Sequence, residues 1–272
     1  MAVPTLVELA ESGAHFGHHR SLTFPKARTF VFTVKSNVAL IDLEQTQKAI
    51  EQAQKIITDY QKEGKSILFV GTKRSVRQMV KMVAESVNAS YITERWFGGM
   101  LTNFGTMQGN IKRMNDLEAF LASPKAARLS KKDRLVQARR LARYHRFLGG
   151  ISTLKAMPDL IVLASASEDA IAIGEANQLE IPVLAIMDTD MNPDRITYPI
   201  PANDDAPRAV ELILRAIVSA PSVKAAPKAP EITEEPVSEA EPKKVTKKVV
   251  AKKTTTKEVS KTTKKTTKTA KK

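Results

Sequence analysis

The sequence predicts an α/β protein: an open three-layer sandwich with a mostly parallel sheet, into which a helical hairpin is inserted. Short β-rich segments alternate with amphipathic helices along the chain, which is typical of a parallel sheet covered by helices on both faces. Residues 104–150 interrupt this alternation with two helical stripes and no strand between them. A length of 272 residues suits one such domain or two small ones.

The individual elements follow from periodicity and from glycine and proline positions. Apolar residues at helical spacing predict five helices in the body, at residues 6–13, 43–63, 75–87, 169–179 and 208–218. Runs of β-branched and aromatic residues predict strands at 29–34, 38–41, 66–70, 90–92, 160–164 and 183–186. The first two strands form either a hairpin or two consecutive short strands. We expect residues 188–207 to be an irregular loop.

Residues 104–150 predict an antiparallel pair of helices, each roughly 30 Å long. The first apolar stripe consists of Met107, Ile111, Met114, Leu117 and Leu121. A break at Ser123-Pro124 separates it from a second stripe, which consists of Leu135, Ala138, Ala142, His145 and Leu148. We expect the two stripes to pack against each other and to leave the cationic side chains facing outward.

The positive charge of the chain is concentrated in two segments. Residues 104–150 carry 11 Lys or Arg against 3 acidic residues, and residues 221–272 carry 15 Lys against 6 acidic residues. The chain as a whole has a formal charge of +14, so the remaining body is slightly acidic. A solvated helical face usually mixes both signs, whereas a one-sided basic face repels itself unless an anion covers it. The pattern therefore favours nucleic acid as the partner.

Composition also divides the chain into three parts. Residues 1–103 and 151–220 are expected to form the globular body, and residues 104–150 the inserted basic hairpin. Residues 221–272 are rich in Lys and Thr and contain no aromatic residue. Such a segment cannot bury enough apolar surface to offset its ordering entropy, so we predict that this tail is disordered.

Several classes of protein are excluded or disfavoured. The chain has no cysteine, which excludes disulfides and thiolate metal sites. Its start lacks the cationic and apolar segments of a secretory signal, and its apolar runs are too short to span a bilayer. We therefore expect a soluble intracellular protein.

Three segments resemble nucleotide-binding or metal-binding sites, but the sequence argues against each of these assignments. The turn Val70–Ser75 lacks the second glycine of a nucleotide-binding loop. The acidic loop that begins at Asp188 has prolines at positions 193 and 199, where a calcium loop needs Gly and Glu. For His15, His18 and His19 we favour packing and hydrogen bonding over metal ligation. No nucleophile can be matched to a base, so we predict no enzymatic activity.

A glycine-rich stretch surrounds each end of the predicted hairpin. The segment Arg95–Asn103 contains the only tryptophan and a glycine pair, and a second pair follows the other helix. Glycine lets backbones approach closely or adopt positive φ. We predict that these residues form the root of the hairpin: Trp96, Gly98, Gly99, Gly149 and Gly150.

Six motifs that occur in order resemble the small ribosomal subunit protein two family in its bacterial form, over roughly residues 4–219. They are His15–His18, Ile67–Lys73, Arg95–Asn103, Leu148–Ile151, Ile181–Val183 and Asn203–Asp205. The resemblance implies a flavodoxin-like sheet and a hairpin that binds small-subunit ribosomal RNA (rRNA), with no enzymatic activity and no cofactor. It also implies neighbouring small-subunit proteins as partners, including the large mRNA-binding protein, and a cytoplasmic, ribosome-bound location without a membrane.

The resemblance and the charge pattern together give a set of predicted rRNA contacts: Lys73, Arg74, Arg95, Lys112, Arg113, Lys131, Lys132, Arg139, Arg140, Arg143 and Arg146. His18, Asp188 and Asp204 match positions at which some family members hold a divalent metal, but we commit to no metal site.

Two other functions stay open at this point. One is a free-standing nucleic-acid-compacting protein whose tail acts like that of a linker histone. The other is a nucleotide-dependent α/β enzyme that uses the cleft of the sheet. Co-sedimentation with ribosomes separates the first from the ribosomal interpretation, and nucleotide binding to a tail-less chain tests the second.

Overall fold

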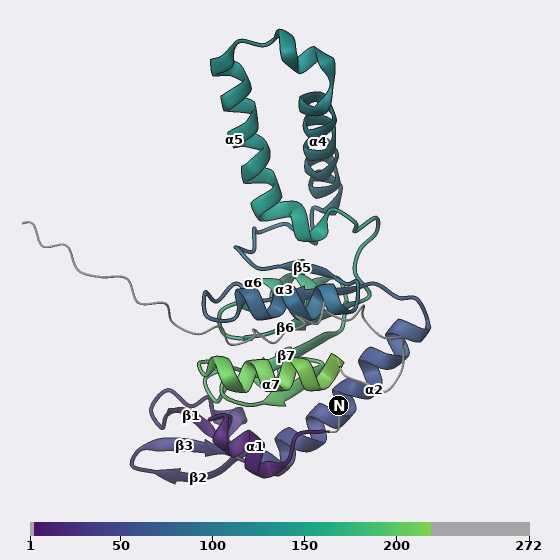
Figure 1. The fold of residues 1–272 in the computed structure, drawn as a ribbon. Helices are drawn as coiled ribbons and strands as arrows, with labels where there is room; N and C mark the ends of the chain where they lie inside the picture. Colours follow the sequence, from purple (N-terminus) through teal and green to yellow (C-terminus); the bar gives the residue numbers. More distant parts are fainter. Residues whose placement is uncertain (1–2, 219–272) are drawn as a thin grey trace, which may run out of the picture. The chain divides into compact units, whose positions relative to one another are not determined.

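The computed structural model describes residues 3–218 and is built on a five-stranded parallel sheet (Figure 1). Its strands lie in the order β5-β4-β6-β7-β8. Counted from β4, this is the 2-1-3-4-5 order of flavodoxin-like doubly wound folds. The strands are β4 (Ile67–Val70), β5 (Ser90–Ile92), β6 (Leu160–Leu163), β7 (Val183–Met187) and β8 (Tyr198–Pro201). The predicted fold class is confirmed.

Helices cover both faces of this sheet and make the three layers. Successive side chains of each strand point to opposite faces; Phe69, for example, packs in one core and Leu68 in the other. The first core is shared with α2 (Leu43–Lys62), α3 (Arg77–Ser86) and α7 (Pro207–Val218). The second core is shared with α6 (Ala170–Gln178). All four strands β4, β6, β7 and β5 begin and end close to where the sequence predicts them.

A second, smaller sheet is formed near the N-terminus. It is antiparallel, with order β1-β3-β2, and follows the short helix α1 (Leu6–Glu11). Its strands are β1 (Phe16–His19), β2 (Val31–Lys35) and β3 (Val38–Ile41), with the 3-10 helix η1 (Pro25–Phe30) between the first two. Strands β2 and β3 form a hairpin whose turn residues Ser36 and Asn37 have φ of 51° and 64°, as tight hairpin turns require.

Two strands were not predicted. Strand β8 and the 3-10 helix η4 (Pro193–Arg195) occupy part of the segment expected to be an irregular loop. Strand β8 contains two prolines, which argue against a strand in a sheet interior but are tolerated at an edge, where one row of N–H groups has no partner strand. Strand β1 contains Gly17 and two histidines, a composition with little β-propensity.

The inserted hairpin lies between β5 and β6 in the sequence and consists of two helices side by side (Figure 1). They are α4 (Phe104–Ala122) and α5 (Lys131–Leu148), joined by the 3-10 helix η2 (Pro124–Arg128), and a further 3-10 turn, η3 (Gly149–Ile151), follows. The hairpin core is continuous with the core on the α6 side of the sheet. The prediction of a disordered tail at 221–272 concerns residues outside those described.

The apolar stripe is confirmed for α4, but on α5 it is confirmed only at Leu148 and wrong at the other four positions. Met107, Ile111 and Met114 are buried, as predicted. On α5, however, Leu135, Ala138, Ala142 and His145 are exposed, and the inward face runs through Gln137, Leu141, Tyr144 and Leu148. The face of α5 that packs inward is displaced by one residue from the predicted face, which is a rotation of about 100° around the helix axis. The phase of α5 is set at its C-terminal end, where Leu148 is buried in the core at the root.

Candidate nucleic-acid interface

The root of the hairpin is held by a buried carboxylate, Glu175 on α6. Its two oxygens accept hydrogen bonds from Trp96 Nε1 at 3.1 Å, Gly99 N at 2.8 Å and Leu101 N at 3.0 Å. Thr102 donates two more, from its backbone N and its hydroxyl, both at 3.2 Å. Burial opposes the charged form, yet these donors lower the pKa of Glu175 below its ordinary value. The loop that leads into α4 therefore closes around one anion.

Sequence reasoning missed Glu175, although a signal was present. The helix that carries it reads AIAIGEANQ, so a single acidic residue stands on an otherwise apolar segment. A lone carboxylate in such a context is buried only when several donors satisfy it.

Only one glycine of each predicted pair is required by the backbone. Gly99 has a φ of +90°, which side-chain-bearing residues rarely adopt. A Cβ on Gly150 would overlap the carbonyl oxygen of Tyr91 on β5, so the close approach of the chain to that strand needs glycine. A Cβ on Gly98 or Gly149 would meet nothing within 4 Å. The buried Trp96 and two of the four predicted glycines thus define the root.

Glu94 ties the other helix of the hairpin to the body. Its Oε2 accepts from Arg146 Nε at 2.9 Å and Nη2 at 2.7 Å, and from Arg77 Nη1 on α3 at 3.2 Å. The hydrogen bonds from Arg146 lower the pKa of Glu94. Arg146 was predicted to contact rRNA, and its side chain remains 63% exposed, but part of its donor capacity is already used to fix α5 on the body.

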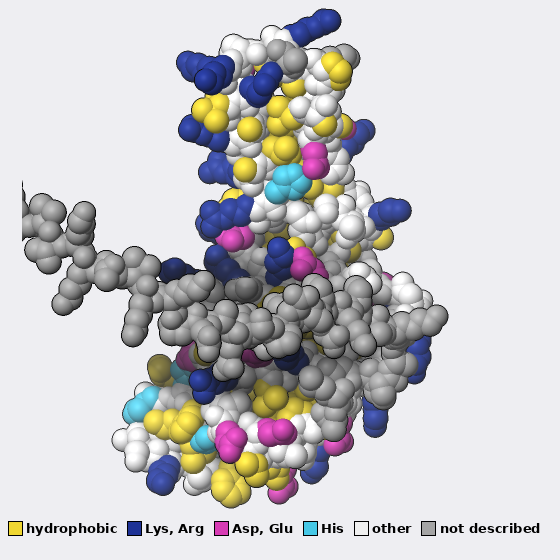
Figure 2. All heavy atoms as spheres, in the orientation of Figure 1, with side chains coloured by type: hydrophobic (Ala, Val, Ile, Leu, Met, Phe, Trp, Pro, Cys, Tyr) yellow, Lys and Arg dark blue, Asp and Glu magenta, His cyan; other side chains and the backbone are white. Residues whose placement is uncertain are grey.

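The remaining predicted cations of the hairpin are exposed and, within residues 3–218, form no ion pair with a carboxylate. Arg113 donates to the Asn110 side chain at 3.2 Å. Arg140 lies 5.7 Å from the ring centre of Tyr144 and donates to its hydroxyl at 3.3 Å. In the described structure the others have no hydrogen-bond or ionic partner: Lys112, Lys131, Lys132, Arg139 and Arg143. Figure 2 shows Lys and Arg side chains distributed along both hairpin helices, with few acidic side chains among them.

Two predicted contacts, Lys73 and Arg74, lie away from the hairpin at the carboxyl edge of the sheet. Lys73 Nζ donates to the Asp204 carbonyl at 2.9 Å and to Asp205 Oδ1 at 2.5 Å. Burial opposes its charge, but these aspartates raise the pKa of Lys73 above its ordinary value. The positive charge of its ammonium group is therefore compensated by these two aspartates of the body. Arg74 is exposed, and no partner for it occurs among the described residues.

The three residues that match metal positions all lie at this edge, where His18 and Asp188 form an ion-pair contact. His18 Nδ1 lies 3.0 Å from Asp188 Oδ2. Burial opposes protonation of His18, and the surrounding aspartates, with Asp188 first, nevertheless raise its pKa. For Asp188 burial is the larger effect and raises its pKa, and the contact with His18 only partly opposes it.

Asp204, the third of these residues, is satisfied by other groups. Its Oδ2 accepts from Ser165 Oγ at 2.6 Å and Ser167 Oγ at 3.1 Å, and its Oδ1 lies 3.5 Å from Lys73 Nζ. An ammonium beside a carboxylate opposes a second cation there. No group of three His, Cys, Asp or Glu side chains in the described part of the chain is arranged to hold a metal ion.

The fold and the charges define a class: an α/β protein with a rooted helical hairpin whose cations are exposed and, within the described residues, mostly without an acidic partner. Among the described residues, no helix is both long and apolar enough to cross a membrane. Comparison with protein families matches residues 9–223 to ribosomal protein S2. The chain belongs to the ribosomal protein S2 family.

Individual relatives agree with this assignment. The chain is 42% identical over 216 residues to the small ribosomal subunit protein uS2 of Helicobacter hepaticus, covering 79% of this chain and 82% of that protein. It is 37% identical to uS2 of Wolinella succinogenes, with coverage of 89% and 91%. It is 41% identical to uS2 of Thermus thermophilus, with coverage of 77% and 82%.

The predicted family is therefore confirmed, and with it a structural ribosomal role rather than an enzymatic one. Neither alternative, the free-standing compacting protein or the nucleotide-dependent enzyme, gains support from these relatives.

Proposed function

We propose that this protein is held in the small ribosomal subunit by its hairpin, which binds small-subunit rRNA, and that it acts there in the cytoplasm. The observation that supports this most is the set of exposed hairpin cations without internal partners. Uncompensated charge on a fixed arm is costly for the free protein and favourable against phosphate. The names of the relatives supply the small subunit as the setting.

The geometry of the arm favours recognition by shape. Arg139, Arg140 and Arg143 follow one another on a single helix, and guanidinium groups hold phosphates in a fixed, bidentate geometry. Folded RNA is read largely through its backbone and its shape. An arm whose root is fixed by Glu175 and Glu94 presents these groups at defined positions, so it can select a folded RNA surface as well as attract it.

Among the predicted contacts, we expect unequal contributions. Arg95, Arg74 and the unpaired hairpin cations are free to meet phosphate. Lys73 is engaged by two aspartates, and Arg146 by Glu94, so we expect these two to contribute least. We propose the same division of the chain as the sequence predicts: a body of residues 1–103 and 151–220, the hairpin of 104–150 and the Lys-rich tail of 221–272. Of these, the tail lies outside the described residues.

A second surface suits a neighbouring protein of the small subunit. Large apolar side chains are exposed on and beside the small sheet, including Phe32 at 76% and Leu22 at 61%, together with Phe16 and Val34. Figure 2 shows hydrophobic side chains at the surface in this region. Contiguous exposed apolar side chains mark protein interfaces. We propose this face as the docking surface for a protein partner, and the large mRNA-binding protein is the first candidate.

Both proposals can be tested with reconstituted small subunits. Purified chain is added to subunits that lack it, and incorporation is measured by co-sedimentation at several salt concentrations. Stable, stoichiometric incorporation that persists above about 0.2 M salt is expected. Replacing Phe32 and Phe16 with Ser should leave incorporation intact and reduce recruitment of the large mRNA-binding protein. Failure of the unaltered chain to incorporate would contradict the rRNA proposal.

A further inference from the structure

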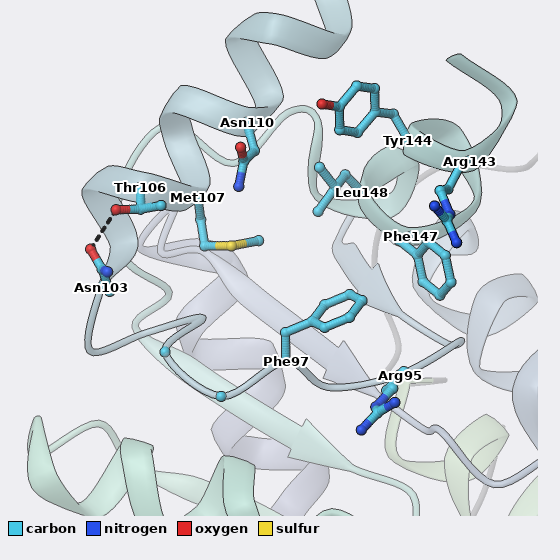
Figure 3. Close-up of a pocket in the computed structure, with 12 residues that line it drawn as sticks. Arg95, Phe97, Asn103, Thr106, Met107, Asn110, Arg143, Tyr144, Phe147 and Leu148 are labelled. Atoms are coloured by element: carbon cyan, nitrogen blue, oxygen red, sulfur yellow. Dashed lines mark hydrogen bonds between the residues drawn. The ribbon is translucent and has the colours of Figure 1, made fainter. Parts of the chain in front are cut away.

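A cavity of about 610 Å³ lies at the root of the hairpin, between α4, α5 and the loop that leads into α4. Figure 3 shows its lining: Met107 and Asn110 come from α4, Tyr144 and Leu148 from α5, and Phe97 from the loop. Its size falls within the roughly 300–1,000 Å³ of pockets that hold small ligands. The predicted RNA-binding arm therefore contains a concave site as well as a charged surface.

The floor of the cavity offers an aromatic surface. Phe97 is 38% exposed although it is a large apolar side chain, and its ring meets Phe147 edge-on, with centroids 5.4 Å apart. This contact restrains the ring of Phe97, and Figure 3 shows that the ring projects toward the space between the two helices. A fixed, partly exposed aromatic ring is the platform on which an unstacked base packs.

The rim of the cavity is cationic and rich in hydrogen-bond donors. Arg95 and Arg143 line it, and neither has a partner within residues 3–218. The Oδ1 atoms of Asn103 and Asn110 accept hydrogen bonds from Thr106 and Arg113 respectively, and no acceptor for their side-chain amide nitrogens occurs among residues 3–218. The lining contains no carboxylate. Charge complementarity thus favours an anionic ligand with carbonyl groups and a flat apolar ring.

We propose that this cavity binds one unpaired nucleotide of RNA, with its base against Phe97 and its flanking phosphates at Arg95 and Arg143. This inference rests on the proposed rRNA-binding function and adds a specific contact to it. A duplex cannot enter a cavity between two helices, whereas a single extruded base can. The two asparagine amides can donate to base carbonyl groups, which would give the arm a preference among bases that phosphate contacts alone do not supply.

The first test blocks the cavity without removing charge. Small subunits are reconstituted with the full-length chain, and dimethyl sulfate and a carbodiimide probe the base edges of unpaired rRNA nucleotides. The unaltered chain should protect a nucleotide next to the hairpin root. Asn110→Trp should fill the cavity and, in subunits that have incorporated it, restore the reactivity of that nucleotide at least about five-fold. Asn115→Trp, on the exposed side of the same helix, is the matched control and should give the unaltered footprint.

The second test separates stacking from charge. Phe97→Ala should weaken binding of the full-length chain to small-subunit rRNA roughly 5- to 100-fold, because base–aromatic stacking is lost, while the salt dependence stays the same. Arg95→Ala should instead reduce the slope of log affinity against log salt by about 0.7. Far-ultraviolet circular dichroism shows whether each variant is folded, and Phe97→Tyr, which keeps the ring, should restore binding.

The outcomes distinguish this inference from the proposed function. If the unaltered chain incorporates and the Asn110→Trp and Phe97→Ala variants give its footprint and affinity, the nucleotide pocket is wrong and the charged arm stands. If the unaltered chain does not incorporate, the proposed function fails and the pocket fails with it. A photoreactive p-azidophenylalanine at position 97 that crosslinks to a ribosomal protein, and not to rRNA, would also overturn the nucleotide assignment.

Discussion

Two charged regions of this protein treat their charges in opposite ways. At the carboxyl edge of the sheet, Lys73 lies against Asp204 and Asp205, and His18 lies against Asp188. Along α4 and α5, by contrast, Lys112, Arg139 and other cations have no acidic partner in the described structure. The first region compensates its charges internally, and the second leaves them for another molecule.

The difference teaches that the number of charges in a segment does not reveal its role. A switch-point edge of a flavodoxin-like sheet is a common place for a ligand, and here it is filled by the protein's own ion pairs. A helical hairpin is a common structural element, and here it holds the uncompensated charge. The role of a charged side chain depends on whether it already has a partner of opposite charge within the protein.

The largest effect is expected from reversing charge on the hairpin. Replacing Arg139, Arg140 and Arg143 together with Glu should weaken rRNA binding roughly 10³-fold or more, since each charged hydrogen bond to phosphate contributes about 1.5–3 kcal/mol. Helical content should not change, because all three side chains are exposed. Filter binding to small-subunit rRNA, with circular dichroism alongside, measures both. A folded variant with unaltered affinity would show that the arm is only a solvated face.

The matched control for that variant reverses the same number of cations on the body. Lys48 and Lys55 on α2 and Arg208 on α7 are exposed and lie away from the hairpin. Their replacement with Glu should lower affinity far less, by the long-range charge effect alone.

The next largest effect concerns the buried anion that holds the arm. Glu175→Ala should lower the free energy of unfolding by about 3–5 kcal/mol, because five donors lose their acceptor. Trp96, the only tryptophan, donates directly to Glu175 and reports the change by fluorescence. Because the pKa of Glu175 is lowered in the folded state, its contribution is present above the unfolded pKa near 4.5 and is lost as pH falls through the folded value. A variant with unaltered denaturant midpoint and acid transition would contradict this account.

Asp169 sharpens the comparison, because it lies at the paired edge with Thr72 as its hydrogen-bond partner and no cation beside it. Thr72 Oγ1 donates to it at 2.8 Å, but burial raises its pKa to about 6. The folded state therefore holds a proton more tightly than the unfolded state, so stability should fall as pH rises from about 4 to 6. Asp169→Asn should remove this dependence and stabilise the protein by about 1–3 kcal/mol at pH 7. Urea unfolding across pH measures it, and an unchanged pH profile in the variant would refute the assignment.

The smallest effect is expected at Lys73. Lys73→Met removes the cation from Asp204 and Asp205 and should lower stability by about 1 kcal/mol. Binding to rRNA should stay within about two-fold of the unaltered chain, because this ammonium is already compensated. A loss of rRNA affinity as large as that for a single hairpin arginine would place Lys73 in the RNA contact after all.

Much of the fold follows from local pattern, and the failures have physical causes. Buried parallel strands such as Ile67–Val70 are short apolar runs between helices. The alternation of such runs with helical segments is enough to predict them. Strand β8 was missed because its prolines are acceptable only at an edge, and which strand is at the edge is a property of the whole sheet. The phase of α5 was missed except at Leu148, because Leu141 and Tyr144 are selected by packing at the root and against α4, not by hydrophobicity along the helix.

The candidate site likewise has features that the sequence predicts and features that it does not. The sequence is enough to locate the cationic hairpin and its glycine-rich root, because both depend on composition and on short motifs. It does not reveal that Glu175 holds the root or that the charge of Lys73 is compensated, since their partners are 73 or more residues away in the chain. Pairing between distant charges depends on the fold, and a charge count cannot report it.

The salt dependence of rRNA binding tests the central claim most directly. Affinity for small-subunit rRNA is measured from about 0.05 to 0.3 M salt for three full-length proteins. They are the unaltered chain, a triple variant with Arg139, Arg140 and Arg143 changed to Gln, and the single variant Lys73→Gln. Each phosphate contact contributes about 0.7–0.9 to the slope of log affinity against log salt. We predict that the triple variant loses about 2–3 from this slope and that Lys73→Gln loses none. Equal slopes for all three proteins would contradict the account.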